Sequence, residues 1–318
     1  MNGPFWKDSV RLDPSASGHL AALFTILVWG TTFISTKVLL VHFQPVEILF
    51  IRFVIGFLAL VVVFPRRLKD TTPKQELTLA AAGLCGVCLY YLLENIALTS
   101  TMASNISVIV SIAPFFTAIL SHFLLKEKGT LRIHFFLGFA VAMVGIAFIS
   151  FNGSTLHLSP VGDILALLAA IVWAFYSILT RLISGYGYPT VLTTRRTFFY
   201  GILFMIPALF LLDFHPELTR FADPVSLLNM VFLGLGASAL CFVTWNFAVK
   251  QLGPVKTSIY IYMVPVITVT ASVLILHEPF TWMTGVGTVL TLAGLFLSEC
   301  KFSKRPAPDQ STDRSPSV

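Results

Sequence analysis

Apolar residues fill ten stretches of about 20 residues, and the short intervals between them carry polar residues and turn formers such as Gln44-Pro45 and Gly253-Pro254. A helix of about 20 residues crosses the roughly 30 Å of hydrocarbon in a bilayer. The pattern therefore predicts ten membrane-spanning helices. We place them near residues 19–41, 45–64, 77–98, 102–125, 134–151, 161–183, 190–212, 226–249, 254–276 and 281–299.

Residues within these stretches recur at constant spacing. Trp29 and Arg52 return 144 positions later as Trp173 and Arg196. A second set returns 151 positions later: Asn95, Pro114 and Glu127 recur as Asn246, Pro265 and Glu278. Each copy of the repeat holds five predicted spans, and an odd number of spans places the two copies in opposite orientations across the bilayer.

The spans and the repeat together predict an all-α integral membrane protein of ten transmembrane helices, built as two inverted five-helix repeats. The expected parts are an N-terminal tail (1–18), a first repeat (19–151), an external linker (152–160), a second repeat (161–299) and a C-terminal tail (300–318).

Composition agrees with this class of protein and excludes an ordinary soluble domain. Of 318 residues, 56% are hydrophobic and 11% are charged, against roughly 45–50% and about 25% in soluble domains. The net charge of +6 does not indicate nucleic-acid binding, because most Lys and Arg residues lie in short loops and tails. With the N-terminus inside, Arg220 is the one basic residue of the predicted outer loops. We therefore expect both termini in the cytoplasm and the chain in the cell (inner) membrane.

The sequence shows no cofactor or metal chemistry. Cys85 and Cys88 form a CxxC inside an apolar run with no second pair, and His122 lies alone within its span, so we interpret all three as packing residues. The P-loop pattern GxxxxGK[ST] is absent, which argues against ATP-driven pumping by this chain alone. An integral-membrane enzyme should show clustered acids, paired His ligands or a Ser near a base, and none stands at suggestive spacing.

The ends of both repeats carry recognisable motifs. The first span opens with LVWGTTFISTKVL, the first repeat ends with IAPFFTAILSHFLLKEK and FLGFAVAMVGIAFIS, and the second ends with MVPVITVTASVLILHEP and GVGTVLTLAGLFLS. Over nearly the whole chain these segments resemble the EamA-type members of the drug/metabolite transporter superfamily. The resemblance implies a ten-helix inner-membrane carrier, commonly an exporter of amino acids and small metabolites. The motifs belong to the scaffold and do not name a substrate.

Polar and aromatic residues share one face in several predicted spans, where they could line a substrate cavity. Spans one and six place Trp29 and Thr32, and Trp173 and Tyr176, at matching helical positions. We expect cavity lining, with interhelical packing as the alternative. Spans four and nine carry further candidates at equivalent positions: Ser107, Ser111 and the helix-kinking Pro114, matched by Ser258, Tyr262 and the helix-kinking Pro265. For these the alternative is a packed kink whose Ser hydroxyls bond to their own helix.

Span three ends with Tyr91, Glu94 and Asn95, and the counterparts of the last two are Trp245 and Asn246. Burying a charge at a helix centre costs about 2.5–3.5 kcal/mol, so Glu94 should be paired, protonated or solvated. An ion pair with Arg52 is one reading, and titration coupled to transport is another. The equivalent amides of Asn95 and Asn246 could line opposite ends of one cavity or serve in packing.

The roles of the other charged residues can be interpreted in two ways each. Arg196 has Trp245 where the equivalent acid would stand, so it either joins the basic cluster with Arg195 or attracts an anionic group such as a substrate carboxylate. Glu127 and Glu278 end spans four and nine, where we interpret them as helix-end residues, with gate contacts as the alternative.

The expected function is secondary transport by alternating access between the two repeats, with export of small metabolites such as amino acids or their derivatives. Driving force is either proton exchange through Glu94 or downhill facilitation. The expected partners are a small-molecule substrate, the lipid bilayer and protons, with no nucleic acid, in a monomer or homodimer. A non-transporting membrane sensor or scaffold is the alternative outside the transporter class.

Overall fold

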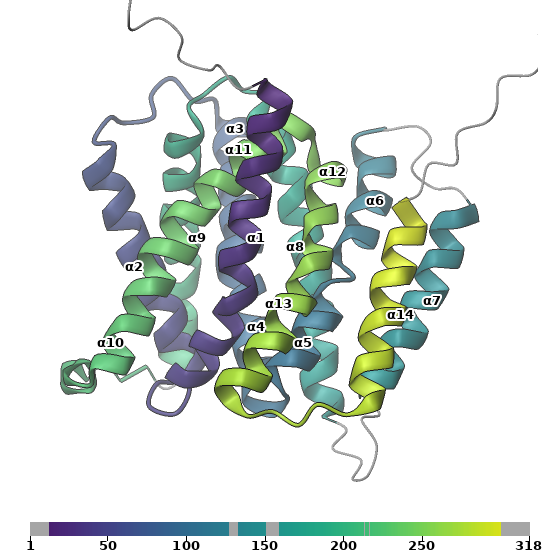
Figure 1. Cartoon of the computed structure of the whole chain (residues 1–318). Helices are drawn as coiled ribbons and strands as arrows, with labels where there is room; N and C mark the ends of the chain where they lie inside the picture. The colour runs from purple at the N-terminus through teal and green to yellow at the C-terminus, as the bar shows by residue number, and fades with distance from the viewer. Residues whose placement is uncertain (1–12, 127–132, 151–158, 213, 216, 300–318) are drawn as a thin grey trace, which may run out of the picture.

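The computed structural model describes residues 13–126, 133–150, 159–212, 214–215 and 217–299, and within them the chain forms helices joined by short connections (Figure 1). No strand occurs in the described residues. The helices of the first repeat are α1 (Pro14–Leu39), α2 (Pro45–Val63), α3 (Pro73–Gly83), η1 (Leu84–Leu89), α4 (Tyr90–Ser100), α5 (Ala103–Val110), α6 (Ala113–Leu124) and α7 (Ile133–Ser150).

The second repeat follows the same order of spans, with additional short 3-10 and π-helical segments. Its helices are α8 (Pro160–Ser184), α9 (Thr190–Leu211), η2 (Leu218–Ala222), α10 (Pro224–Val231), η3 (Phe232–Leu240), α11 (Cys241–Leu252), α12 (Pro254–Ser258), η4 (Ile259–Met263), α13 (Val264–Ala271), η5 (Ser272–Leu276) and α14 (Trp282–Glu299). Eight continuous helical spans are long and apolar enough to cross a membrane, and α7 and α14 complete the ten. The all-α, ten-helix prediction is therefore confirmed.

Two of the spans that begin earlier than the apolar pattern predicts have first turns capped by side chains. The third span starts at Pro73 rather than near residue 77, and Thr72 and Gln75 form a reciprocal capping box there. Proline at the first helical position costs no hydrogen bond, because its missing N–H has no partner in a helix anyway. At α10 the cap is Asp223, whose pKa is lowered by hydrogen bonds from the hydroxyl and the amide of Ser226.

The two repeats are interleaved rather than side by side. Helix α1 packs against α11 and α4 packs against α8, while α2 contacts η3 and α9 contacts α3 and η1. The last helices of the repeats, α7 and α14, pack together at one edge (Figure 1). The long central helices of one repeat thus find their main partners in the other, and the central core lies between the repeats.

The repeats run in opposite directions through this core. At the end of α1, Lys37 donates to the carbonyls of Leu98 and Thr101 at the end of α4. A Cβ on Gly162, near the start of α8, would lie 3.2 Å from the side chain of Thr101. The end of α1 and the start of α8 therefore lie on the same side of the molecule, as the inverted repeat requires (Figure 1).

Four of the ten spans depart from regular α-helix at equivalent positions of the two repeats. The third and eighth spans pass through the π-helical segments η1 and η3. The fourth span breaks after α5 and restarts at Ala113, one residue before Pro114. The ninth tightens to the 3-10 segment η4 and restarts at Val264, one residue before Pro265. Such interruptions leave backbone carbonyls to be satisfied by neighbouring groups and are often found at functional sites.

Close backbone approach between α3 and α9 depends on glycine. A Cβ added at Gly83 would lie 2.5 Å from the carbonyl oxygen of Thr197 and 2.7 Å from the amide nitrogen of Gly201. Both atoms belong to the backbone and cannot rotate away. Small residues are the usual means by which membrane helices approach this closely.

We therefore expect Gly83→Ala to destabilise the protein by about 1–3 kcal/mol, the usual cost of overpacking. The measurement is the melting temperature of the purified protein in detergent. Gly236→Ala is the matched control, because a Cβ there meets only the ring of Phe232, at 3.5 Å. Equal melting temperatures for the two variants would contradict the proposed role of Gly83.

Candidate functional site

Aromatic side chains from both repeats meet at the centre of the molecule. Trp29 of α1 and its repeat equivalent Trp173 of α8 pack edge to face, with ring centroids 5.2 Å apart. Trp245 lies 5.1 Å from Trp29, and Tyr90 lies 4.8 Å from Trp173. All four rings are buried. The apolar core and the contact between the repeats are thus formed by the same residues.

A small cavity of about 30 Å³ lies within this cluster. Its walls come from five spans: Ile26, Trp29, Thr32, Phe33, Tyr90, Tyr91, Glu94, Val110, Trp173, Ile261 and Val264. Five of the residues proposed from sequence, Trp29, Thr32, Tyr91, Glu94 and Trp173, therefore line one cavity. That volume admits a water-sized group.

Glu94 is the acidic residue in the cavity wall, and its side chain is only 1% exposed. Its carboxyl group interacts with the side chain of Tyr90 and with the positive charge of Arg52. The ion pair considered from sequence is not formed, because Arg52 and Glu94 are not among the ion pairs of the described residues. Arg52 instead donates from Nε to Ser238 Oγ at 3.0 Å and stacks on Tyr91, with Cζ 4.4 Å from the ring centroid.

Ser238 was not anticipated from sequence, since it lies in a run of small residues of η3 that the polar-face argument passed over. It reaches Arg52 because α2 of the first repeat packs against η3 of the second. A hydroxyl partner leaves the buried guanidinium without a neutralising contact, which makes the centre of the molecule electrostatically receptive to an anion.

Four buried N–H donor groups around the cluster have no hydrogen-bond partner among the described residues. They are Nη1 and Nη2 of Arg52, Nε1 of Trp173 and Nε1 of Trp245. Trp29, by contrast, donates to the carbonyl of Ala237 at 2.9 Å. A buried donor without an acceptor costs about 1–3 kcal/mol, and all four groups are donors rather than acceptors. The arrangement suits a ligand that brings acceptor oxygens.

The two equivalent asparagines hold helices together. Asn95 donates to the carbonyl of Pro45 at 3.1 Å, which ties α4 to the start of α2. Asn246 accepts from the Tyr176 hydroxyl at 2.8 Å and donates to Thr194 at 3.0 Å. Neither lines the central cavity, and Asn246 borders a separate, smaller one. Their lining of a shared cavity stays a prediction.

The polar positions of the fourth and ninth spans are buried but do not line the central cavity. Ser107, Ser111 and Ser258 each donate to the carbonyl three residues earlier in the chain, at 2.6–2.8 Å. Tyr262 is 7% exposed. In this conformation the three Ser hydroxyls donate to backbone carbonyls of their own helices beside the helix breaks.

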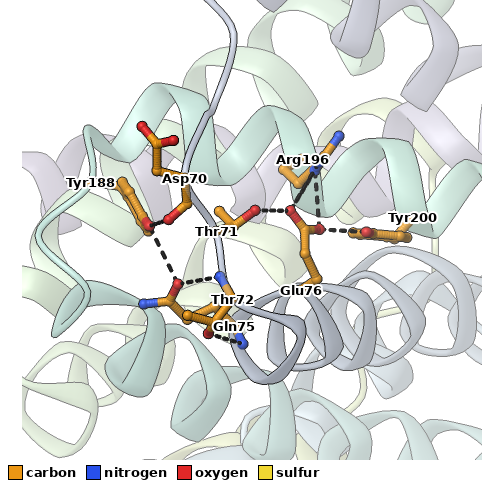
Figure 2. A network of polar contacts seen from close by, with 8 residues as sticks. All are labelled: Asp70, Thr71, Thr72, Gln75, Glu76, Tyr188, Arg196 and Tyr200. Carbon is orange, nitrogen blue, oxygen red and sulfur yellow. Dashed lines mark hydrogen bonds and ion pairs between the residues drawn. The ribbon is translucent and has the colours of Figure 1, made fainter.

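Arg196 has a counter-charge that the repeat comparison did not reveal. Its guanidinium binds both carboxylate oxygens of Glu76 in α3, at 2.9–3.2 Å (Figure 2). The hydroxyls of Thr71 and Tyr200 also donate to this carboxylate. Neither sequence reading included this ion pair, although Arg196 does lie beside Arg195 in one basic cluster. Glu76 escaped notice because it stands in the polar first turn of α3, a segment considered only for its basic residues.

Contacts on the opposite side of the molecule join the repeats around the start of α5. The carboxylate of Glu278 accepts from the amides of Ala103 and Ser104 at 2.9 and 3.3 Å and from the Ser104 hydroxyl at 2.7 Å. An anion at a helix N-terminus is favourable because the free amides point at it. Glu278 thus caps the N-terminus of α5 in the other repeat, a role that differs from the sequence interpretation of a residue fixing the end of its own span. Glu127, its repeat equivalent, lies outside the described residues.

Comparisons with known proteins match both repeats. The model of the EamA-like transporter family matches residues 16–151 and 160–299. An uncharacterized transporter of Archaeoglobus fulgidus is 26% identical over 289 residues, which cover 89% of this chain and 97% of the relative. A probable amino-acid metabolite efflux pump of Salmonella typhimurium is 26% identical over 295 residues, covering 89% and 95%. A crystal structure with 19% identity superposes with a TM-score of 0.65, covering 89% of this chain and 98% of the other, which supports the fold.

The Glu76–Arg196 pair predicts a measurable coupling between α3 and α9. Because the Arg196 side chain is 37% exposed, solvent screening limits the expected coupling to about 0.5–1 kcal/mol. The measurement is a double-mutant cycle of Glu76→Gln and Arg196→Gln, with thermal unfolding in detergent. The cycle of Glu76→Gln with Arg195→Gln is the control, since Arg195 donates to the Phe64 and Arg66 carbonyls instead. Strict additivity in the first cycle would contradict the pair.

Proposed function

The chain belongs to the EamA-like transporter family, and on that premise we propose that it is a secondary transporter that exports small metabolites such as amino acids or their derivatives. It is a multi-pass membrane protein of the transporter class. The basic loops favour an inner-membrane orientation with both termini in the cytoplasm.

The observation that carries the proposal is the buried carboxyl group of Glu94 in the wall of the aromatic cavity, with unpartnered N–H donors around it. A zwitterionic amino acid offers an ammonium group to a carboxylate and a carboxylate to N–H donors. In the proposed complex the ammonium group binds Glu94, and the substrate carboxylate accepts from Trp173 and, after rearrangement, from Arg52. The aromatic rings would cover an apolar side chain.

Substrate binding in this proposal requires motion, because the cavity admits only a water-sized group. The interleaved packing supports alternating access, in which the two inverted repeats rock about the centre and open it to each side in turn. The helix interruptions beside the cluster, before Pro114 and Pro265, are suitable hinges. The Salmonella relative is named as an amino-acid metabolite efflux pump, which supports the substrate class and the direction.

The test of the function is metabolite profiling of medium and cytosol from cells that overproduce the protein. We expect one or a few amino acids or derivatives to accumulate in the medium. Trp173→Phe retains a ring but removes the N–H donor, so it should lower export several-fold. Trp282→Phe is the control, because Trp282 is 68% exposed on α14, away from the cavity. Profiles that match those of cells without the protein would refute the proposal.

Proton coupling through Glu94 makes a separate prediction. Glu94→Gln retains the size and burial of the side chain but removes its charge and titration, so transport should slow through loss of the ammonium contact and what remains should not depend on pH. The measurement is uptake into proteoliposomes at a series of pH values, with circular dichroism to establish that the variant is folded. Glu217→Gln changes an exposed carboxyl group outside the spans and should retain the wild-type profile. An unchanged pH profile for Glu94→Gln would rule out this role.

A further inference from the structure

A second and larger concavity lies apart from the aromatic cavity, at the end of the molecule where α2 ends and α9 begins. It is a groove of about 680 Å³, within the range of roughly 300–1,000 Å³ typical of ligand sites. Phe57 and Val61 of α2 and Phe199 of α9 form its apolar wall. Arg67, Arg195 and Arg196 form the charged part of its lining.

The groove carries positive charge that the protein does not neutralise. Arg196 is paired with Glu76. In the part of the chain that the structure describes, neither Arg67 nor Arg195 forms an ion pair. The positive charges of Arg67 and Arg196 both repel that of Arg195. Arg195 donates to the carbonyls of Phe64 and Arg66, which uses only two of its five N–H donors.

The apolar wall continues onto surface that faces the hydrocarbon of a bilayer. On α2, Leu58, Val62 and Val63 are 55–80% exposed, and on α9 Phe199 and Leu203 are 44–48% exposed. Arg67 follows the end of α2, and Arg195 lies in the second turn of α9, so we expect both near the depth of the lipid headgroups. This end also carries the basic loops that predict a cytoplasmic orientation, and the cytoplasmic leaflet is the one rich in anionic lipid.

We propose that this groove binds one anionic phospholipid. Its phosphate contacts Arg67 and Arg195, and an acyl chain lies along Phe57 and Val61. A phosphate diester presents acceptor oxygens that match guanidinium donors, whereas a zwitterionic headgroup adds a cation that the arginines repel. The occupant would bridge the end of α2 in the first repeat and the start of α9 in the second, and it is independent of the transported substrate.

The experiment is native mass spectrometry of the full chain in detergent, with added phosphatidylglycerol or phosphatidylethanolamine. We expect one phosphatidylglycerol to be retained in preference to phosphatidylethanolamine. Arg67→Gln should weaken retention about five-fold, the effect of losing one basic contact to an anionic lipid. Arg66→Gln is the matched control, because Arg66 is the adjacent, exposed arginine that does not line the groove.

A second variant, Val61→Trp, fills the apolar part of the groove without changing its charge. It should lower phospholipid retention and leave binding of glycerol phosphate, the headgroup alone, unaffected. Equal losses in Arg67→Gln and Arg66→Gln would overturn the proposal in favour of a diffuse surface charge. Retention that Val61→Trp does not affect, equal retention of both lipids, or a protein dimer in place of the lipid would also overturn it.

Discussion

Trp29 and Trp173 occupy the same place in the two repeats, and they pack edge to face at the centre of the protein. A residue can contact its own repeat equivalent only near the pseudo-twofold axis that exchanges the repeats. The other central contacts follow in related pairs, since α1 packs on α11 as α8 packs on α4, and α2 packs on η3 as α9 packs on η1. In a bilayer, polar groups must find partners within the protein, and here many lie in the opposite repeat.

Against this symmetric background, the polar residues depart from symmetry. Arg52 is fully buried and is held by Ser238 and the ring of Tyr91, whereas its equivalent Arg196 is partly exposed and paired with Glu76. The equivalent of Glu94 is Trp245, an indole that packs in the aromatic cluster. Arg52 and Glu94 are buried and desolvated, so their charges respond strongly to any ligand, whereas Glu76 and Arg196 are partly solvated and contribute mainly to holding α3 on α9.

The sequence predicted the helices, their order and their inversion well, because hydrophobic length and odd span number depend on local composition alone. It also predicted, from helical spacing, that Trp29, Trp173 and Glu94 would line one cavity. It could not supply the partners of Arg52 and Arg196. Those partners depend on which helix of one repeat packs on which helix of the other, and neither spacing nor repeat equivalence encodes that choice. The indole N–H of Trp29 has a hydrogen-bond acceptor and that of Trp173 does not. Only the three-dimensional structure shows this difference.

The replacement of Glu94 by Trp245 across the axis has an energetic consequence. If two identical inverted repeats exchanged conformations to open a carrier first inward and then outward, the two states would have equal free energies by symmetry. Every difference between the repeats removes that degeneracy, and a difference of about 1.4 kcal/mol already changes the ratio of the states ten-fold. If the protein works by alternating access as proposed, a carboxyl group on one side of the axis and an indole on the other would set a preferred resting state, which a change in protonation or bound ligand would reverse.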